Sequence, residues 1–333
     1  MIAASVLDLS PVPEGASFGQ ALAASADLAR HAEALGYRRF WLAEHHNMPG
    51  IASAATAVVI GHVAAATSTI RVGAGGIMLP NHAPLQVAEA FGTLDALHPG
   101  RIDLGLGRAP GTDQATAHAL RRTMVGGENR FPSDVVELQR LLGWGTPEGP
   151  VRAYPGDGTR VPIWMLGSSL FGAELAAYLG LPYAFASHFA PQALAEALHV
   201  YRTHFRPSEQ LDRPYAVMGT NIFAADTDEE AEVLATSMMQ AFVNLRRGRP
   251  GRIPRPDANF PATLSPGERQ MLDQVLSVSA IGSVRRVREQ MSELVAAFQP
   301  DELIIAANIH DQDDRKKSFG LAMEALSEIK APQ

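Results

Sequence analysis

The sequence predicts a single (β/α)₈ barrel, a TIM barrel, over residues 1–333. Two observations favour this fold: short apolar segments alternate with amphipathic ones, and motif-like residues follow directly after the apolar segments. Strands alternating with helices pair in parallel, because each crossover helix returns the chain to the same edge of the sheet. Eight such units favour a closed barrel, which places its chemistry at the carboxyl ends of its strands. An open doubly wound sheet is the alternative, but no Gly-x-Gly-x-x-Gly follows the first apolar segment.

The predicted strands are short and apolar. They cover residues 5–9, 39–43, 70–75, 101–105, 162–166, 183–186, 215–224 and 302–307. The first lies in an N-terminus without a basic leader and soon meets Asp8, which indicates a strand and not a secretion signal.

The predicted helices follow the strands and carry apolar residues at helical spacing. The first, residues 18–35, stops at Gly36, a residue typical of a helix end. The others cover residues 53–66, 84–97, 133–142, 168–179, 191–204, 228–245, 283–298 and 313–329.

Two segments interrupt the alternation. Residues 107–132 form a long excursion after the fourth strand. Residues 246–266, late in the barrel, are rich in arginine, proline and glycine. A solvated loop would explain this second insertion, and so would a mobile lid over the barrel mouth, since long loops in compact domains are often functional.

Composition narrows the functional classes. Of the residues, 46% are hydrophobic and 19% charged, which is enough for a large core. The net charge of −7 gives no attraction to nucleic acid. The absence of cysteine excludes disulfides and thiolate metal sites and fits a cytoplasmic protein. The longest weakly apolar run, residues 51–66, is too short to cross a membrane.

The first candidate cluster is Glu44, His45 and His46, at the end of the second strand. Neighbouring side chains on an extended segment point in opposite directions, so both histidines cannot easily face one metal, and we expect no metal site. A histidine facing the mouth could donate or accept a proton near neutral pH. A purely structural pair is the alternative.

Glycines and an arginine form two further clusters. Gly75 and Gly76 end the third strand, where bare backbone suits close approach of a flat ring or a tight turn. Gly107 and Arg108 follow the fourth strand, and an arginine framed by glycines suits capture of a phosphate. An ordinary ion pair would also explain the arginine.

Gly167, Ser168 and Ser169 end the fifth strand and open a helix. Free backbone N–H groups and serine hydroxyls converge there, which attracts anions, although simple N-capping would use the same residues. Gly282 and Ser283 open a later helix in the same way and form a rival phosphate site.

The ordered runs WLAEHH (41–46), IRVGAGG (70–76) and PGRIDLGLGR (99–108) resemble the bacterial luciferase-like monooxygenases. The resemblance covers nearly the whole chain and implies a barrel that takes FMN, usually as reduced flavin supplied by a separate reductase. It implies that His45 is catalytic and that Gly75 and Gly76, often joined by a cis peptide, lie beside the flavin ring. It assigns the flavin phosphate to Arg108, Ser168 and Ser169.

One departure matters: the luciferase pattern has a cysteine immediately before the arginine, where this chain has Gly107. Light emission is therefore not expected. The leading hypothesis is a monooxygenase that uses reduced FMN and O₂ on a small organic substrate, with His45 shuttling a proton and Glu44 orienting its neighbours. The alternatives are a deazaflavin-dependent hydride-transfer enzyme and a flavin-binding protein without turnover.

The remaining expectations concern partners and the barrel mouth. Helix 53–66 shows small apolar residues on most faces, and we expect a homodimer through it and helix 84–97, as is common in the resembling family. Further candidate residues at the mouth also follow strand ends; they are Asp8, Met78, His82, His188 and Asn308.

Overall fold

The computed structural model describes residues 1–108, 116, 119–120, 130–146 and 149–331. Eight parallel strands form its centre. They are β1 (Ala3–Asp8), β2 (Arg39–Leu42), β3 (Arg71–Met78), β4 (Ile102–Gly107), β5 (Ile163–Gly167), β6 (Tyr183–Phe185), β7 (Ala216–Ala224) and β9 (Glu302–Ala306).

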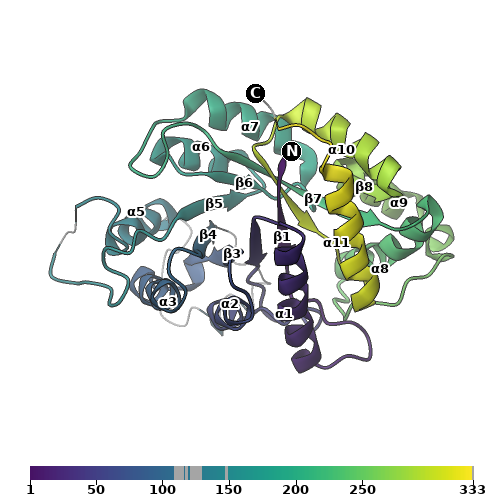
Figure 1. Cartoon of the computed structure of the whole chain (residues 1–333), viewed down its shortest axis with the longest axis horizontal. Helices are drawn as coiled ribbons and strands as arrows, with labels where there is room; N and C mark the ends of the chain where they lie inside the picture. Colours follow the sequence, from purple (N-terminus) through teal and green to yellow (C-terminus); the bar gives the residue numbers. More distant parts are fainter. Residues whose placement is uncertain (109–115, 117–118, 121–129, 147–148, 332–333) are drawn as a thin grey trace.

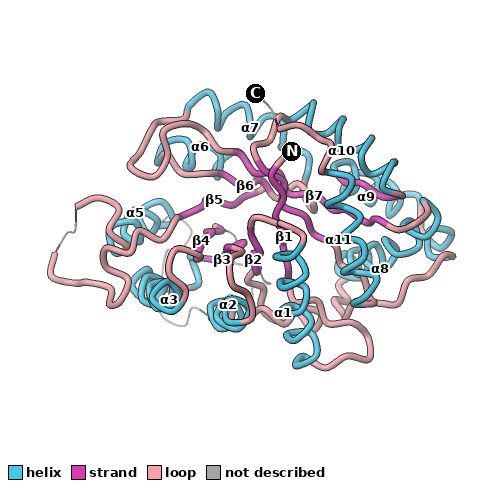
Figure 2. Tube along the Cα trace, viewed as in Figure 1, coloured by secondary structure: helices cyan, strands magenta, loops and turns pink. Residues whose placement is uncertain are grey.

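These strands close on themselves. Each strand from β1 to β6 pairs with its successor, β7 pairs with both β6 and β9, and β9 returns to β1. Figures 1 and 2 show the strands at the centre with helices outside them. The eight predicted strands are these eight, so the closed barrel is confirmed and the open sheet is excluded.

The helices cover the outside of the barrel (Figure 1). They are α1 (Phe18–Ala34), α2 (Thr56–Ala65), α3 (Pro84–Leu97), α5 (Phe131–Leu141), α6 (Leu170–Leu179), α7 (Leu194–His204), α8 (Asp228–Arg246), α9 (Pro266–Val275), α10 (Val284–Phe298) and α11 (Gln312–Leu326). The two chain ends meet beside β1, where the Ile2 N–H donates to the Ile329 carbonyl at 2.8 Å.

Two elements were not predicted. Helix α9 and strand β8 (Ser279–Gly282) lie in a stretch where the sequence gives no clear alternation. Strand β8 pairs only with the last four residues of β7, from Asn221 to Ala224, because β7 is long enough to extend past the barrel wall. It is therefore an addition to the barrel and not one of its eight strands.

A polar layer fills the amino-terminal end of the barrel. Arg39, 4% exposed, donates to Glu302 at 2.9 Å through Nε and to Asp103 at 2.9 Å through Nη1. Both carboxylates are fully buried. Ser5 and Tyr215 also donate to Glu302, and Arg71 and Trp41 also donate to Asp103. Buried charges are tolerated when they are paired in this way.

Apolar side chains fill the middle of the barrel. Trp41 and Trp164 meet edge to face with ring centroids 5.1 Å apart, and Leu7, Val217 and Ile304 pack beside them. With its amino end and middle filled, the barrel leaves its carboxyl end as the place for a site, as is usual in this fold.

The late insertion lies at that end. In residues 246–266, the Ile253 N–H donates to the Val12 carbonyl, and the Glu14 N–H donates to the Ile253 carbonyl, both at 2.9 Å. Val12 and Glu14 follow the carboxyl end of β1, so the insertion borders the mouth. This is the position that the lid interpretation requires, and motion of the loop stays a prediction. Most of the excursion 107–132 lies outside the described residues.

None of the helices in the described ranges has both the length and the apolar character that a bilayer crossing requires.

Candidate active site

Glu44 joins the ends of β2 and β3. Its backbone N–H donates to the Gly76 carbonyl at 3.1 Å, and its carboxylate accepts the Met78 N–H at 3.0 Å. His46 donates to the same carboxylate through Nε2 at 2.7 Å, and His82 does so at 2.9 Å. The side chain is 1% exposed, so the carboxylate depends on these donors in place of water.

The charge of Glu44 is stabilised by these donors. Burial alone would raise the pKa of the carboxyl, but the hydrogen bonds from His82, His46 and Met78 outweigh burial and lower the pKa below its ordinary value. The group is therefore ionised at neutral pH with its lone pairs engaged. A carboxylate held in this way orients its neighbours and is not a free base.

His45 lies beside this cluster and is partly buried. Its Nδ1 contacts the Glu44 carbonyl oxygen. Because a carbonyl oxygen only accepts, the neutral ring carries its proton on Nδ1 and presents a lone pair on Nε2. Burial lowers the pKa of His45, and the contact with Glu44 offsets this only in part. The ring is therefore mostly neutral at pH 7 and can take a proton through Nε2.

His46 points toward the Glu44 carboxylate, whereas Nδ1 of His45 contacts the Glu44 carbonyl oxygen. Since a carboxylate only accepts, the facing nitrogens of His46 and His82 both carry hydrogen, and neither directs a lone pair at a common point. Within the described residues, no group of three histidine or acidic side chains could hold a metal ion.

The glycines of β3 allow the barrel wall to pack closely. A Cβ on Gly75 would lie 2.8 Å from Leu7 Cδ1, and one on Gly76 would lie 2.7 Å from the Gly105 carbonyl oxygen. The barrel backbone thus excludes a side chain at Gly76, whereas one at Gly75 would press on the Leu7 side chain. The peptide bond between Gly75 and Gly76 is cis, as the family resemblance implied.

Arg108 lies at the start of α6. Its guanidinium stacks over the Phe171 ring at 4.2 Å, and Phe171 is in the first turn of α6. Arg108 is exposed and forms no ion pair with any described residue. The stacking holds its charge beside the helix start. Gly107 ends β4, and a Cβ there would lie 2.8 Å from Met78 Sδ.

Within the part of the chain that the structure describes, the start of α6 keeps donors without partners. Ser169 is the N-cap residue, yet its side chain accepts no capping hydrogen bond. Gly167 ends β5 and leads into Ser168. A helix start with unused hydroxyls and N–H groups beside a guanidinium attracts an anion through both charge and hydrogen bonds. The structure therefore brings together Gly107, Arg108, Gly167, Ser168 and Ser169, which come from two separate strand ends.

The rival phosphate site is occupied by the protein itself. The Ser283 N–H at the start of α10 donates to the Asp228 carboxylate at 2.7 Å. A Cβ on Gly282 would lie 2.8 Å from the same carboxylate. Because this carboxylate already caps the helix, a second anion would be repelled. The prediction of a phosphate site at Gly282 and Ser283 is wrong.

The contacts of the other candidate mouth residues show which of them lie at the mouth. Asp8 bonds to Arg315 of α11 at 2.7 Å and is fully buried, so it belongs to the helical layer and not to the mouth. Met78 and His82 belong to the Glu44 cluster. His188 lies near His45, whose charge acts on it. No contact with a described residue defines a role for Asn308.

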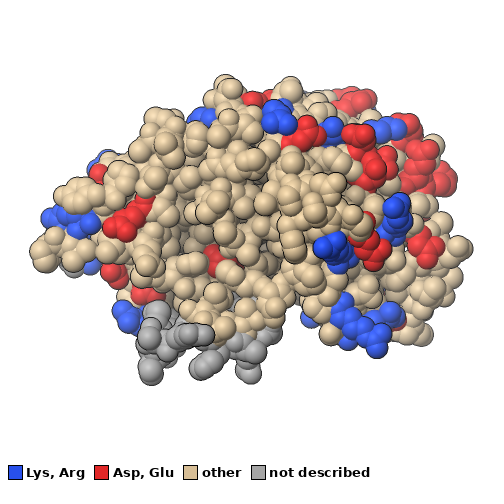
Figure 3. Space-filling view, turned by 90° about the horizontal axis from the view of Figure 1, so that it is seen from below, with Lys and Arg blue, Asp and Glu red and all other residues tan. Residues whose placement is uncertain are grey.

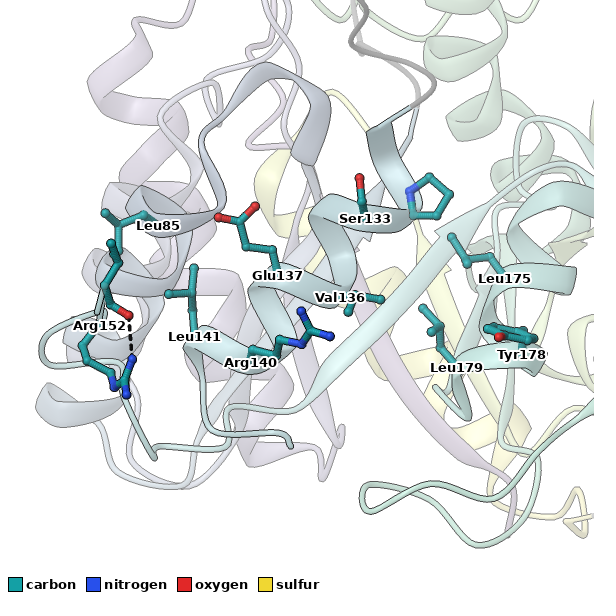
Figure 4. Close-up of a pocket in the computed structure, with 12 residues that line it drawn as sticks. Leu85, Ser133, Val136, Glu137, Arg140, Leu141, Arg152, Leu175, Tyr178 and Leu179 are labelled. Carbon is teal, nitrogen blue, oxygen red and sulfur yellow. Dashed lines mark hydrogen bonds between the residues drawn. The ribbon is translucent and has the colours of Figure 1, made fainter. Parts of the chain in front are cut away.

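A groove of about 690 Å³ lies elsewhere, on the outer helical layer between α5 and α6. Figure 4 shows Val136 and Arg140 of α5 on one side of it and Leu175 and Tyr178 of α6 on the other. None of the mouth residues lines this groove, so the groove is not the candidate active site.

Comparisons with known proteins agree with this geometry. A model of the family described as luciferase-like monooxygenase matches residues 3–299. A luciferase-like monooxygenase from Escherichia coli strain K12 is 53% identical over 98% of both chains. An N-acetyl-S-alkylcysteine monooxygenase from Bacillus subtilis strain 168 is 32% identical over 98% of both. The crystal structure of apo-MsnO8 superposes with a TM-score of 0.92 at 34% identity and covers 100% of both chains.

Proposed function

The chain belongs to the luciferase-like monooxygenase family, and on that premise we propose that it binds FMN at the barrel mouth. The reaction proposed is oxidation of a small organic substrate with reduced FMN and O₂. The observation that carries the proposal is the pairing of Arg108 with the uncapped start of α6 through the ring of Phe171.

FMN fits the residues present. Its phosphate needs a fixed cation and several hydrogen-bond donors, which Arg108, Ser168 and Ser169 supply. Its flat ring needs a bare wall within reach of that anchor, and Gly75 and Gly76 lie two strands from the start of α6. The rival helix start carries a carboxylate, so it does not compete for the phosphate.

Reduced FMN would supply the electrons that activate dioxygen. The protein's contribution is to position the groups and to move one proton. His45 would accept or return this proton at Nε2, since Nδ1 is held by the Glu44 carbonyl. Glu44 would keep His46, His82 and the backbone after the cis peptide in place.

The substrate is proposed only as a class. The Bacillus relative's substrate carries a thioether, so small thioethers are the first compounds to test. Purified protein, FMN, a separate flavin reductase and NADH would be supplied with air, and sulfoxide formation and oxygen uptake would be measured. No FMN binding would contradict the proposal, and so would binding of a deazaflavin in preference to FMN.

A homodimer through α2 and α3 is part of the proposal. Val58 of α2 and Leu97 of α3 are 73% and 66% exposed. Figure 3 views the face on which α1, α2 and α3 lie, and its centre carries few charged side chains. Light scattering at micromolar concentration should give about twice the mass of one chain, whereas a monomeric mass would remove this part of the proposal.

A further inference from the structure

His188 follows β6 and is held at the carboxyl end of the barrel. Its carbonyl accepts a hydrogen bond from Asn221 Nδ2 at 2.7 Å, and the preceding Ser187 donates through Oγ to the Gly219 carbonyl at 2.6 Å. Both partners belong to β7, so the turn is fastened to the next strand. The position of the ring is thus set by the barrel and not by a free loop.

Gly219 makes room for the His188 ring. Val217 of the same strand packs inside the barrel, and alternation along a strand directs position 219 inward as well. A Cβ on Gly219 would lie 2.7 Å from His188 Nδ1. The imidazole therefore occupies the space that an inward-facing side chain at position 219 would take.

The ring lacks a polar partner. His188 Nδ1 is buried and makes no hydrogen bond with any described residue, and the nearest ring is the edge-on Phe189 at 5.0 Å. Buried polar atoms without a partner are uncommon and call for an explanation. Because Nδ1 is shielded from solvent and packed against Gly219, a ligand in the mouth could reach this ring only through Nε2.

His188 and His45 stand on opposite sides of the mouth. In the closed order of eight strands, β6 and β2 are four strands apart in either direction. Burial, the larger cause, and the charge that His45 carries when protonated together lower the pKa of His188 to about 4.

We propose that His188 is a substrate-binding residue: placed across the mouth from His45, it forms a hydrogen bond through Nε2 with an uncharged substrate lying between the two imidazoles. The inference rests on the proposed function. The mouth has an apolar wall, since Leu9 just after β1 and Leu166 near the end of β5 are partly exposed and pack against the interior cluster. A neutral compound with one hydrogen-bonding group suits these surroundings, because a charged one would be desolvated there without a counter-ion.

The test uses FMN-loaded protein with ¹⁵N-labelled histidine and methyl phenyl sulfoxide, an uncharged hydrogen-bond acceptor. Ring nitrogen signals of His188, identified from the His188→Gln spectrum, should move together with those of His45. The exposed His199 on α7 serves as the internal control and should not move.

Three variants complete the test. His188→Leu should weaken sulfoxide binding, followed through the His45 signals, by about fivefold or more, the usual effect of one lost hydrogen bond. His188→Gln should stay within about twofold of the wild type, and Phe189→Leu should be unchanged. FMN affinity should be the same in all of them, because the phosphate anchor lies elsewhere.

The inference is overturned if the sulfoxide does not bind, if it moves His45 but not His188, or if His188→Leu binds it as the wild type does. In each of these cases intact FMN binding would leave the proposed function standing. Loss of FMN binding by the wild-type protein would instead contradict the proposed function itself.

Discussion

The Glu44 carboxylate accepts the backbone N–H of Met78, two residues beyond the cis peptide of β3, while the Glu44 N–H donates to Gly76. One residue just after β2 thereby fixes the backbone on which the proposed flavin ring would lie. The same carboxylate accepts hydrogen bonds from His46 and His82. The histidine cluster and the glycine backbone at the mouth therefore depend on one charged group.

Glu44→Gln should lower the free energy of unfolding by about 1–3 kcal/mol, measured by urea denaturation. Glutamine keeps one acceptor for Met78 but offers an NH₂ group to histidines that also donate. Glu137→Gln on the exposed face of α5 is the control and should change stability by less than about 0.5 kcal/mol. Equal effects of the two changes would contradict this assignment.

Arg108→Ala should weaken FMN binding by about tenfold to a hundredfold, the cost of losing a charge-assisted hydrogen bond to phosphate. Riboflavin, which has no phosphate, should bind equally to the variant and the wild type. Arg160→Ala removes another exposed arginine stacked on an aromatic ring, that of Trp144, and should leave FMN affinity unchanged. Quenching of flavin fluorescence measures all three, and a parallel loss of riboflavin binding would argue against phosphate anchoring.

His45→Ala should reduce turnover by about 10²- to 10⁴-fold while FMN affinity stays within a few-fold, because the ring moves a proton and does not anchor the phosphate. Burial lowers the pKa of His45 below 6.5, so the neutral form predominates at pH 7. If this form is the base, wild-type turnover should fall as the pH drops through that pKa. Full turnover by the variant would end the catalytic assignment.

Acid should destabilise the fold partly through His188. Burial and the charge of His45 lower its pKa from 6.5 to about 4. Between these values the unfolded chain binds more protons than the native one, so stability falls as the pH falls, by at most about 3 kcal/mol from this group. Urea unfolding would be measured at pH 7 and pH 4.5. The free energy of unfolding should fall less between these pH values for His188→Gln than for the wild type. Identical falls would contradict the contribution assigned to His188.

Glu302→Ala should cost about 3–5 kcal/mol of unfolding free energy, because it leaves the buried Arg39 with only one of its two carboxylate partners. Glu289→Ala breaks an exposed pair with Arg285 and should cost less than about 1 kcal/mol. Thermal and urea unfolding would measure the stability of the two variants. Similar losses of unfolding free energy would show that the buried layer contributes no more than an exposed ion pair.

The eight strands and most helices could be predicted because alternation of apolar and amphipathic segments is a local property. The missed elements, α9 and β8, follow the long insertion and do not continue that alternation. Strand β8 exists because β7 extends beyond the barrel and offers its last four residues for pairing, which no local pattern indicates.

By itself, the sequence determined the barrel, the family and the residue types at each strand end, since these depend on periodicity and on motifs read along the chain. The tertiary structure alone decided which of these residues act together. Arg108 meets the start of α6 only because β4 and β5 are neighbours and Phe171 faces the gap. Ser283 is excluded because Asp228, 55 residues away in the sequence, folds onto it. Side-chain direction and long-range contact come from closure of the barrel, and a linear pattern does not contain them.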